Sequence, residues 1–340
     1  MTETMSAVRV GPGGGVAVRS TPRPAPGAGE VRIDVAYGGI CGSDLHYATS
    51  GRNGSFEVMS FLTLGHEFSG VVSGHGDGVD GPPLGTHVTV HPAQPCARAG
   101  EGPTGRHLLT GSYLGSASTL PHTQGGFADS VVVKADQVRV LPSALPLRRA
   151  ALAEPLAVAL HAIHLAGELA GERVLVVGCG PIGLLAVAAA RISGARVAAA
   201  DIAAQAIERA VRLGAATSYL IPDQSPPSGG FDVVIEASGA AAAIRGAFRQ
   251  VADGGTVIQL AIPSVERADI EVGELIRREI VYRGTWRFDT EIDEAVVLLR
   301  DHPELDEVIT HEFPVAEATE AFEVAQDSQR SSKVLLRFDR

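Results

Sequence analysis

The spacing of hydrophobic residues changes near the middle of the chain. Up to about residue 150, short apolar runs such as VRIDVAYGGI, FSGVV, THVTV and FADSVVV are separated by glycine and proline residues. Short runs of this kind are typical of a mostly antiparallel β domain. From about Leu152, alanine-rich stretches with helical spacing alternate with short runs of β-branched residues. That alternation indicates βαβ units around a parallel sheet.

The second half of the chain predicts a doubly wound sheet. We expect helices over 182–193, 203–213 and 241–251, where apolar residues recur at helical spacing. The strands are expected at RVLVVG, RVAAAD, SYLIP, FDVVIEASG, GTVIQLA and EIVYRG. Two later helical segments (IDEAVVLLRD and ATEAFEVAQDS) and a strand (KVLLRF) are expected to pack back onto the first domain. The prediction is an α/β protein in which 1–150 and 286–340 form one domain and 151–285 form the other.

Composition and charge narrow the possible functions. A chain of 340 residues usually exceeds one hydrophobic core, in agreement with two domains. The formal net charge of -11 provides no basic surface, so nucleic acids and anionic membranes are poor candidate partners and a small molecule fits better. The three cysteines, Cys41, Cys96 and Cys179, lack paired spacing, and the start of the chain lacks a secretory signal. We expect a cytoplasmic protein without disulfides.

A glycine-rich loop stands between a predicted strand and a predicted helix. In VLVVGCGPIGLLAVAAA, Gly178, Gly180 and Gly183 form the pattern GxGxxG. The first glycine permits a tight turn, the second lets the backbone approach a pyrophosphate, and the third allows close packing of helix and strand. The N–H groups at the start of the helix can then bind the phosphates. A glycine-rich turn that binds no nucleotide is the plain alternative.

An acidic residue at the end of the next strand favours the dinucleotide interpretation. Asp201 follows Gly183 by 18 positions, where a carboxylate can accept hydrogen bonds from the adenosine ribose. No arginine follows directly in DIAAQ to receive a 2′-phosphate, so we expect NAD rather than NADP. The expected cofactor site also includes Pro181, Ile182, Ser238 and Ala261.

Two short segments of the first domain concentrate residues that can bind a metal. GGICGSDLHY and LGHEFSG contain cysteine, histidine and carboxylate side chains, and AEPLAVALHA adds Glu154. Such side chains can form three zinc ligands and leave a fourth position for water or substrate. A zinc ion there would lower the pKa of a substrate hydroxyl and so help hydride to leave its carbon. Taken singly, Cys41 or His66 is better explained as an ordinary core or loop residue, but beside a dinucleotide site the combination favours zinc.

These motifs resemble a known family. CGSDLHY, GHE, EPLAVALHA and VGCGPIG, in this order, are similar to the zinc-containing medium-chain dehydrogenases, and the resemblance spans nearly the whole chain. It implies a GroES-like catalytic domain built from both ends of the chain and a Rossmann domain that binds NAD. GRNGSF, YLGSASTLPHTQGGF, HLAGELAGERV and GTWRF are most similar to the L-idonate 5-dehydrogenases of that family, and next to sorbitol and xylitol dehydrogenases. The implied reaction oxidises a secondary alcohol of a sugar acid or polyol to a ketone, with L-idonate to 5-keto-gluconate as the leading expectation.

The resemblance also implies a ligand set. Cys41, His66 and Glu154 would bind one catalytic zinc ion, and Glu67 would hold a zinc-bound water or replace a ligand. Which of the two glutamates binds zinc directly stays open at this point.

Further implied roles concern the proton and the substrate. Ser43 would hydrogen-bond the reacting hydroxyl and pass its proton through the cofactor ribose toward His46, whose ordinary pKa is near neutral. Asp44 would orient the His66 ring. Arg287 would bind a hydroxyl or the carboxylate of a sugar acid, unless it is an ordinary solvated surface arginine. The implied substrate pocket contains Tyr47, Arg287 and Phe288.

The sequence departs from the family at one place. Many members carry a second, structural zinc ion bound by four closely spaced cysteines, but CARAGEGPTGRHLLTGS retains only Cys96. One thiolate cannot hold a tetrahedral structural zinc ion, and we do not expect His91 or His107 to rebuild the site. We therefore predict one zinc ion per chain and no structural zinc.

Two other classes of function compete with this interpretation. A zinc-free quinone or enoyl reductase on the same fold would not need Cys41 or the GHE segment. A noncatalytic NAD-binding or regulatory protein would not need Ser43 and His46. The resemblance also implies a homodimer or homotetramer, paired through the strand at EIVYRG.

Overall fold

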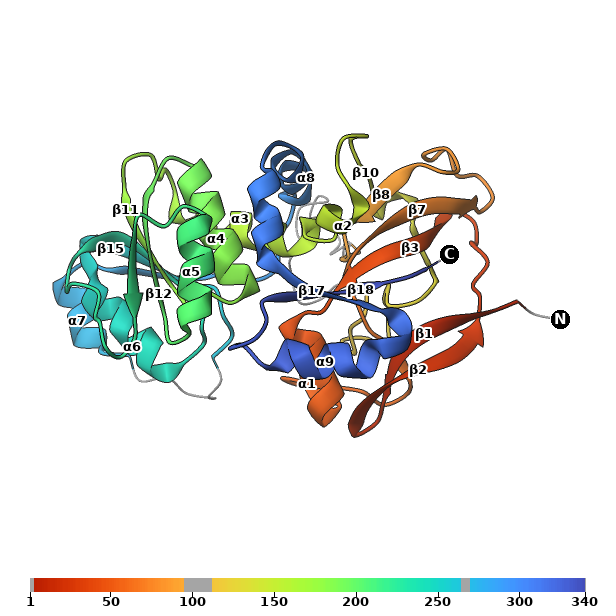
Figure 1. Ribbon diagram of the computed structural model, residues 1–340, viewed down its shortest axis with the longest axis horizontal. Helices are drawn as coiled ribbons and strands as arrows, with labels where there is room; N and C mark the ends of the chain where they lie inside the picture. The colour runs from red at the N-terminus through yellow and green to blue at the C-terminus, as the bar shows by residue number, and fades with distance from the viewer. Residues whose placement is uncertain (1–2, 95–111, 264–269, 340) are drawn as a thin grey trace.

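Two sheets of different construction form the two lobes of the molecule (Figure 1). The computed structural model describes residues 3–94, 112–263 and 270–339. A mostly antiparallel sheet forms the first lobe, here called the β lobe, and a parallel sheet flanked by helices forms the second, the parallel-sheet lobe. No helix in these ranges is long and apolar enough to cross a membrane.

The main sheet of the β lobe has seven strands and includes the C-terminal end of the chain. Its order is β10-β8-β7-β3-β18-β17, and β9 also pairs with β3. Because β18 pairs antiparallel with β3, the end of the chain packs back onto the first domain. The strands of this sheet are β3 (Glu30–Gly39), β7 (Glu67–His75), β8 (His87–Val90), β9 (Ser130–Lys134), β10 (Val138–Val140), β17 (Ile309–Pro314) and β18 (Lys333–Arg337).

Smaller elements complete the β lobe. A three-stranded sheet runs in the order β2-β1-β6, and β4 pairs with β5. These elements are β1 (Thr4–Gly11), β2 (Gly14–Pro22), β4 (Arg52–Asn53), β5 (Phe56–Glu57), β6 (Leu62–Thr63), α1 (Gly42–Ser50), α2 (Leu147–Ala150), α9 (Ala318–Gln326) and the short 3-10 turns η1 (Ala135–Gln137) and η3 (Val315–Glu317).

The parallel-sheet lobe has six strands in the order β13-β12-β11-β14-β15-β16. The chain order reverses between β11 and β14, and ligands of such sheets bind beyond the carboxyl ends of the strands at that point. The strands are β11 (Arg173–Val177), β12 (Arg196–Asp201), β13 (Thr217–Leu220), β14 (Phe231–Glu236), β15 (Val251–Gln259) and β16 (Val281–Gly284). The helices are α4 (Pro181–Ile192), α5 (Ala204–Arg212), α6 (Ala241–Gln250) and α7 (Val272–Arg277).

Helices α3 (Ala153–Ala166) and α8 (Ile292–Asp301) lie between the lobes (Figure 1). The buried residues of α8, such as Ile292 and Leu299, share one core with α3 and α4. The 3-10 turn η2 (Pro303–Val308) joins the same core through Leu305. By contrast, Phe322 of α9 packs in the core of the β lobe. The segment after residue 285 therefore contributes to the cores of both lobes. The packing does not divide the chain at residue 285 alone.

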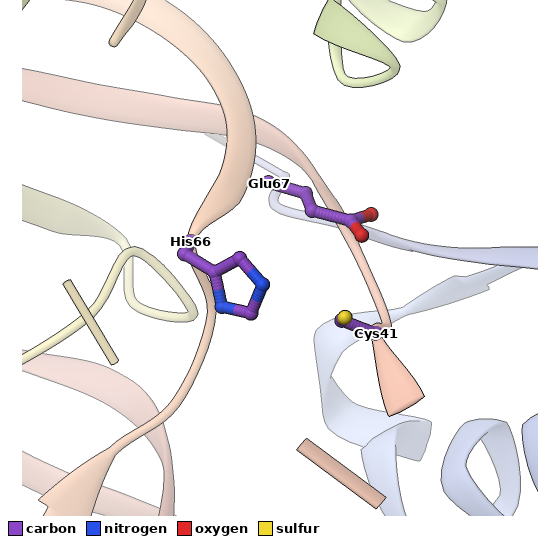
Figure 2. A group of neighbouring side chains, drawn as sticks. All are labelled: Cys41, His66 and Glu67. Atoms are coloured by element: carbon purple, nitrogen blue, oxygen red, sulfur yellow. The ribbon is translucent and has the colours of Figure 1, made fainter. Parts of the chain in front are cut away.

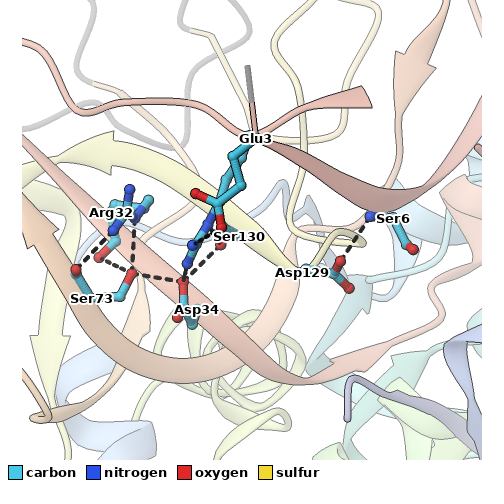
Figure 3. Close-up of polar contacts among 8 residues, drawn as sticks. Glu3, Ser6, Arg32, Asp34, Ser73, Asp129 and Ser130 are labelled. Carbon is cyan, nitrogen blue, oxygen red and sulfur yellow. Dashed lines mark hydrogen bonds and ion pairs between the residues drawn. The ribbon is translucent and has the colours of Figure 1, made fainter. Parts of the chain in front are cut away.

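A polar cluster ties the β1–β2 hairpin to the main sheet (Figure 3). The Oδ1 atom of Asp34, on β3, accepts hydrogen bonds from Arg23 at 2.8 Å, Ser73 at 2.7 Å and Ser130 at 2.7 Å. Burial alone would raise the pKa of Asp34, but the two hydroxyls and the guanidinium outweigh it and lower that pKa. The cluster therefore stabilises the ionised carboxylate.

We expect Asp34→Asn to destabilise the protein by about 1 to 2 kcal/mol near neutral pH, because a charged acceptor of three hydrogen bonds is lost. A pKa that folding lowers contributes stability above the unfolded value of about 3.9, and that stability is lost as the pH falls through the folded pKa. Urea unfolding of both proteins across this range tests the expectation. The difference should shrink in acid, and a difference of constant size would contradict it. Asp80→Asn, at an exposed carboxylate, is the control.

Candidate active site

Three possible metal ligands come together where β3 ends and β7 begins (Figure 2). Cys41 directly precedes α1, and His66 and Glu67 lie at the start of β7. One potential ligand atom from each side chain lies within 4.8 Å of the other two. Within the described ranges no other group of three histidine, cysteine or acidic side chains meets this criterion. The structure thus brings together residues of two segments that the sequence analysis singled out.

Backbone contacts hold the two ligand segments in place. Asp44 is fully buried at the third position of α1, where its carboxylate accepts the N–H of Cys41 at 3.0 Å and the N–H of Gly65 at 3.3 Å. The role predicted for Asp44, which is to orient the His66 ring, stays a prediction. Its carboxylate accepts these two backbone hydrogen bonds because a carboxylate at this helical position reaches back to the residue before the helix. Asp44 therefore fixes the spacing of the ligand segments.

A buried ion pair adjoins the ligand group. Lys333, at the start of β18, is 1% exposed, and its Nζ lies 2.8 Å and 2.6 Å from the two carboxylate oxygens of Glu67. The same ammonium group donates to the carbonyl oxygen of Ile40 at 3.0 Å. Gly39 lies beside Glu67, where an added Cβ would overlap the carboxylate. Lys333 is not predicted from the sequence, where the only sign of its role is a lysine next to the apolar run VLL.

Replacing Lys333 by methionine should destabilise the protein by about 3 to 5 kcal/mol, because it leaves the Glu67 carboxylate buried without its cation. Adding Glu67→Gln to this variant removes the charge and should recover most of the loss. Denaturant unfolding measures both effects. Arg337→Met, on the same strand but with a side chain that is 43% exposed, is the control and should change stability by less than about 1 kcal/mol. A small effect of Lys333→Met would show that another group neutralises Glu67.

Electrostatics at the ligand group favour a cation. Burial alone would lower the pKa of His66, but the neighbouring Cys41, Asp44 and Glu154 outweigh it and raise that pKa to about 10. These neighbours therefore favour a positive charge at the position of the His66 ring. A divalent cation satisfies the same demand, and thiolate, imidazole and carboxylate are the ligands that zinc prefers.

Glu154 approaches the site from the first turn of α3. It is 4% exposed, and its Oε1 accepts a hydrogen bond of 2.5 Å from the Tyr113 hydroxyl. Burial raises the pKa of Glu154. The side chain lies outside the group of three but lines the same cavity as Cys41 and His66.

A cavity of about 440 Å³ lies between the two lobes and contains most of the expected site residues. Ser43 and His46 line it from α1, and Asn53 and Phe56 line it from the segment GRNGSF. The expected residues that line this cavity are Cys41, Ser43, His46, Tyr47, His66, Glu154, Ile182, Ser238, Ala261 and Arg287. Cys41, His66 and Glu154 therefore face one space with residues of α1 and α4, whereas Glu67 does not line it.

Arg287 and Phe288 point in different directions. Arg287 has a positive φ of 53°, and its guanidinium carbon lies 4.0 Å from the ring centroid of Tyr113. Its Nη1 atom is buried and has no hydrogen-bond partner among the described residues. Phe288 does not line the cavity: it is fully buried, with its ring centroid 4.5 Å from that of His91. The aromatic ring is placed in the core, and the polar residue before it is placed at the cavity.

The glycine-rich loop has the geometry of a phosphate-binding turn. Gly178 follows β11 with a φ of 92°, and Gly180 caps α4, which begins at Pro181. A Cβ at Gly180 would meet no atom within 4 Å, whereas a Cβ at Gly183 would overlap the carbonyl oxygen of Gly178. The loop therefore leaves open space beside Gly180 at the N-terminus of α4. One turn later, at Gly183, the helix packs closely against the backbone of Gly178.

Two carboxylates support the loops around this turn. Asp201 accepts the backbone N–H of Cys179 at 2.6 Å and that of Ala203 at 2.8 Å. Glu236, which the sequence analysis did not single out, is fully buried and accepts the N–H of Ser238 at 2.9 Å. Its signal was a charged residue at the end of an apolar strand, in VVIEASG.

The proposed loss of a structural zinc site concerns a segment outside the described ranges. Cys96 and His107 both lie there. His91 is described, and its ring nitrogens contact the Asp289 carbonyl oxygen at 2.8 Å and the Ala93 N–H at 3.2 Å. The absence of a structural zinc ion stays a prediction.

Comparison with known proteins gives matches along most of the chain. Residues 27–143 match the family model of the alcohol dehydrogenase GroES-like domain, and residues 181–301 match that of zinc-binding dehydrogenases. L-idonate 5-dehydrogenase (NAD(P)(+)) of Escherichia coli strain K12 is 33% identical over 90% of this chain and 91% of that protein. Sorbitol dehydrogenase of Gallus gallus is 31% identical over 98% of this chain and 96% of that protein.

Two solved structures share the whole fold. L-idonate 5-dehydrogenase from Escherichia coli has a TM-score of 0.90 and 30% identity, and the match covers 99% of each chain. A protein of Sinorhizobium meliloti 1021, described as a zinc-binding dehydrogenase and bound to NADP, has a TM-score of 0.89 and 31% identity over 98% of this chain and 99% of that one. The predicted fold, a GroES-like domain and a Rossmann domain, is confirmed.

Proposed function

Because the chain belongs to the family of zinc-type medium-chain alcohol dehydrogenases, we propose that it is an NAD-linked enzyme that oxidises a secondary alcohol of a sugar acid or polyol to a ketone. The observation that carries this proposal is the meeting of Cys41, His66 and Glu67 beside a cavity that also reaches Ile182 at the start of α4. One substrate in this cavity could therefore contact both a metal ion and a bound nucleotide.

The side chains at the site fit a zinc ion. Cys41 and His66 supply thiolate and imidazole, and either Glu67 or Glu154 supplies the third ligand. When bound, zinc would act as a Lewis acid on the substrate hydroxyl, and NAD would accept the hydride. A zinc-free reductase would leave this donor set without a role, so rapid inactivation by a chelator separates the two functions.

We propose that two side chains of α1 move a proton. Ser43 lines the cavity and is partly buried, and His46, one turn later on the same helix, lines the cavity and is exposed. We assign Ser43 to the hydrogen bond with the reacting hydroxyl and His46 to the release of its proton to water, which suits an imidazole. These residues also distinguish an enzyme from a noncatalytic NAD-binding protein.

Arg287 is the best candidate for recognition of a sugar acid. Arg287 lines the cavity with its guanidinium over the Tyr113 ring, and a guanidinium binds a carboxylate through two parallel hydrogen bonds. We therefore propose L-idonate as the substrate, with sorbitol- or xylitol-type polyols as the alternative. Two of the relatives are named for L-idonate and sorbitol.

Production of NADH with L-idonate, sorbitol, xylitol and threonine, measured side by side, tests this assignment. Arg287→Met should raise the KM for L-idonate by about tenfold or more and change the KM for neutral polyols much less, because only the acid offers a carboxylate. Arg52→Met belongs in the same assay, because Arg52 is the other arginine that could meet the carboxylate. Arg196→Met is the control, since its guanidinium donates to the carbonyl oxygen of Gly171 at 2.9 Å and the residue does not line the cavity. No turnover on any member of the panel, with either NAD or NADP, would refute the proposed activity.

The cofactor preference and the assembly complete the proposal. Asp201 ends β12 beside the glycine-rich loop and would accept ribose hydroxyls, so we propose a preference for NAD over NADP. One relative is named for both cofactors and another is bound to NADP, so both belong in the assay. We also propose a homodimer or homotetramer paired through β16, which ends the six-stranded sheet.

A further inference from the structure

Tyr113 stands between the two halves of the candidate site. Its ring lines the cavity, although the residue is only 6% exposed. On one side the hydroxyl donates to Glu154 at 2.5 Å, and the ring lies edge-on to His66 with centroids 5.4 Å apart. On the other side the guanidinium of Arg287 lies 4.0 Å from the ring centroid.

The hydroxyl fixes the carboxylate of Glu154. The carboxylate oxygen of Glu154 is the acceptor and the phenolic O–H the donor in this hydrogen bond. A buried carboxylate needs hydrogen-bond donors, and a donor behind a group at a metal site orients that group. Removal of the hydroxyl alone should loosen Glu154 without changing the shape of the cavity.

The face of the Tyr113 ring holds the guanidinium of Arg287. A cation over an aromatic face is attracted by the ring, and this attraction is larger where water is excluded. Glu154 lies close enough for its charge to act on Arg287, so the two groups attract one another. Without the ring, the guanidinium could turn toward Glu154, and an ion pair with that carboxylate would occupy the donors that a substrate carboxylate needs.

We propose that Tyr113 is a positioning residue with two separable functions: its hydroxyl holds Glu154 beside Cys41 and His66, and its ring holds the Arg287 guanidinium at the cavity, available to a substrate carboxylate. The inference rests on the proposed function. It adds a residue that links zinc retention to the preference for acids over neutral polyols.

Two substitutions at this position separate the functions. Tyr113→Phe keeps the ring and removes the hydroxyl, so zinc affinity should fall by about tenfold while the affinity for L-idonate stays within about twofold of wild type. Tyr113→Leu removes the ring as well, so it should also lower the affinity for L-idonate by about tenfold and leave the affinity for sorbitol almost unchanged. Tyr37→Phe, whose ring does not line the cavity, is the control.

Binding measurements decide the matter without turnover. Zinc affinity is measured by competition with a chromogenic chelator, and L-idonate and sorbitol affinities by calorimetry on the zinc- and NADH-loaded full chain. Tyr113→Phe that holds zinc as tightly as wild type would overturn the role of the hydroxyl. Equal L-idonate affinities of wild type and Tyr113→Leu would overturn the role of the ring. Absence of turnover in wild type counts against the proposed function instead, so the two failures are distinguishable.

Discussion

Cys41→Ser should lose zinc and reduce turnover by about a thousandfold or more. A Lewis-acidic ion contributes several kcal/mol to stabilising charge in the transition state, and each 1.36 kcal/mol corresponds to about tenfold in rate. Cys41 supplies the thiolate of the group that also contains His66 and Glu67, and a hydroxyl is a much poorer zinc ligand at neutral pH. Metal analysis of the purified protein and the rate of NADH production measure the two losses.

The chain offers a matched control for this substitution. Cys179 is 1% exposed and lies in the glycine-rich loop of the parallel-sheet lobe. Its Sγ is 3.8 Å from the carbonyl oxygen of Ala200 on β12. Cys179→Ser should therefore retain the zinc content of the wild type, which we expect to be one ion per chain. Full zinc content in Cys41→Ser would remove this residue from the ligand set, and two ions in the wild type would contradict the predicted loss of the structural site.

The parallel-sheet lobe could be predicted from the sequence in some detail. Helices expected over 182–193, 203–213 and 241–251 are found as α4 (Pro181–Ile192), α5 (Ala204–Arg212) and α6 (Ala241–Gln250). These elements are predictable because alternating strands and helices carry a local period, and their connections are short. In the β lobe the apolar runs locate β3, β7, β8 and β9, but they predict neither the β1–β2 hairpin nor the order of the strands. The position of β18 beside β3 depends on contacts between the two ends of the chain, which no local pattern encodes.

The candidate site divides in the same way. Cys41 and His66 could be identified because they lie in short segments dense in metal-binding side chains. Lys333 could not, because it contacts a carboxylate 266 positions away. Tyr113 could not either, since an aromatic residue in a glycine-rich segment has no spacing that predicts a contact with Glu154. Contacts between distant segments emerge only when the fold is known.

Replacing Gly183 by alanine should destabilise the parallel-sheet lobe by several kcal/mol and abolish cofactor binding. A Cβ at this position would overlap the carbonyl oxygen of Gly178 and lie 3.4 Å from the Cβ of Ala237. Overpacking costs about 1 to 3 kcal/mol where side chains can adjust, and more is expected here because the obstacle is backbone. Gly178 cannot move freely, since its N–H donates to the Ala200 carbonyl oxygen at 2.8 Å. Denaturant unfolding and NADH fluorescence titration measure the two effects.

Gly180→Ala is the matched substitution in the same loop, and it should separate folding from binding. Gly180 has a φ of -66°, and an added Cβ would meet no atom within 4 Å, so the stability of the protein should change little. If the pyrophosphate approaches the backbone here, the same methyl group would obstruct it and weaken NADH binding by about tenfold. Wild-type NADH affinity in Gly180→Ala would place the phosphates elsewhere. The close approach of Gly183 to the carbonyl oxygen of Gly178 leaves no room for a methyl group unless α4 moves away from β11. Wild-type stability in Gly183→Ala would contradict the prediction and show that α4 can move in this way.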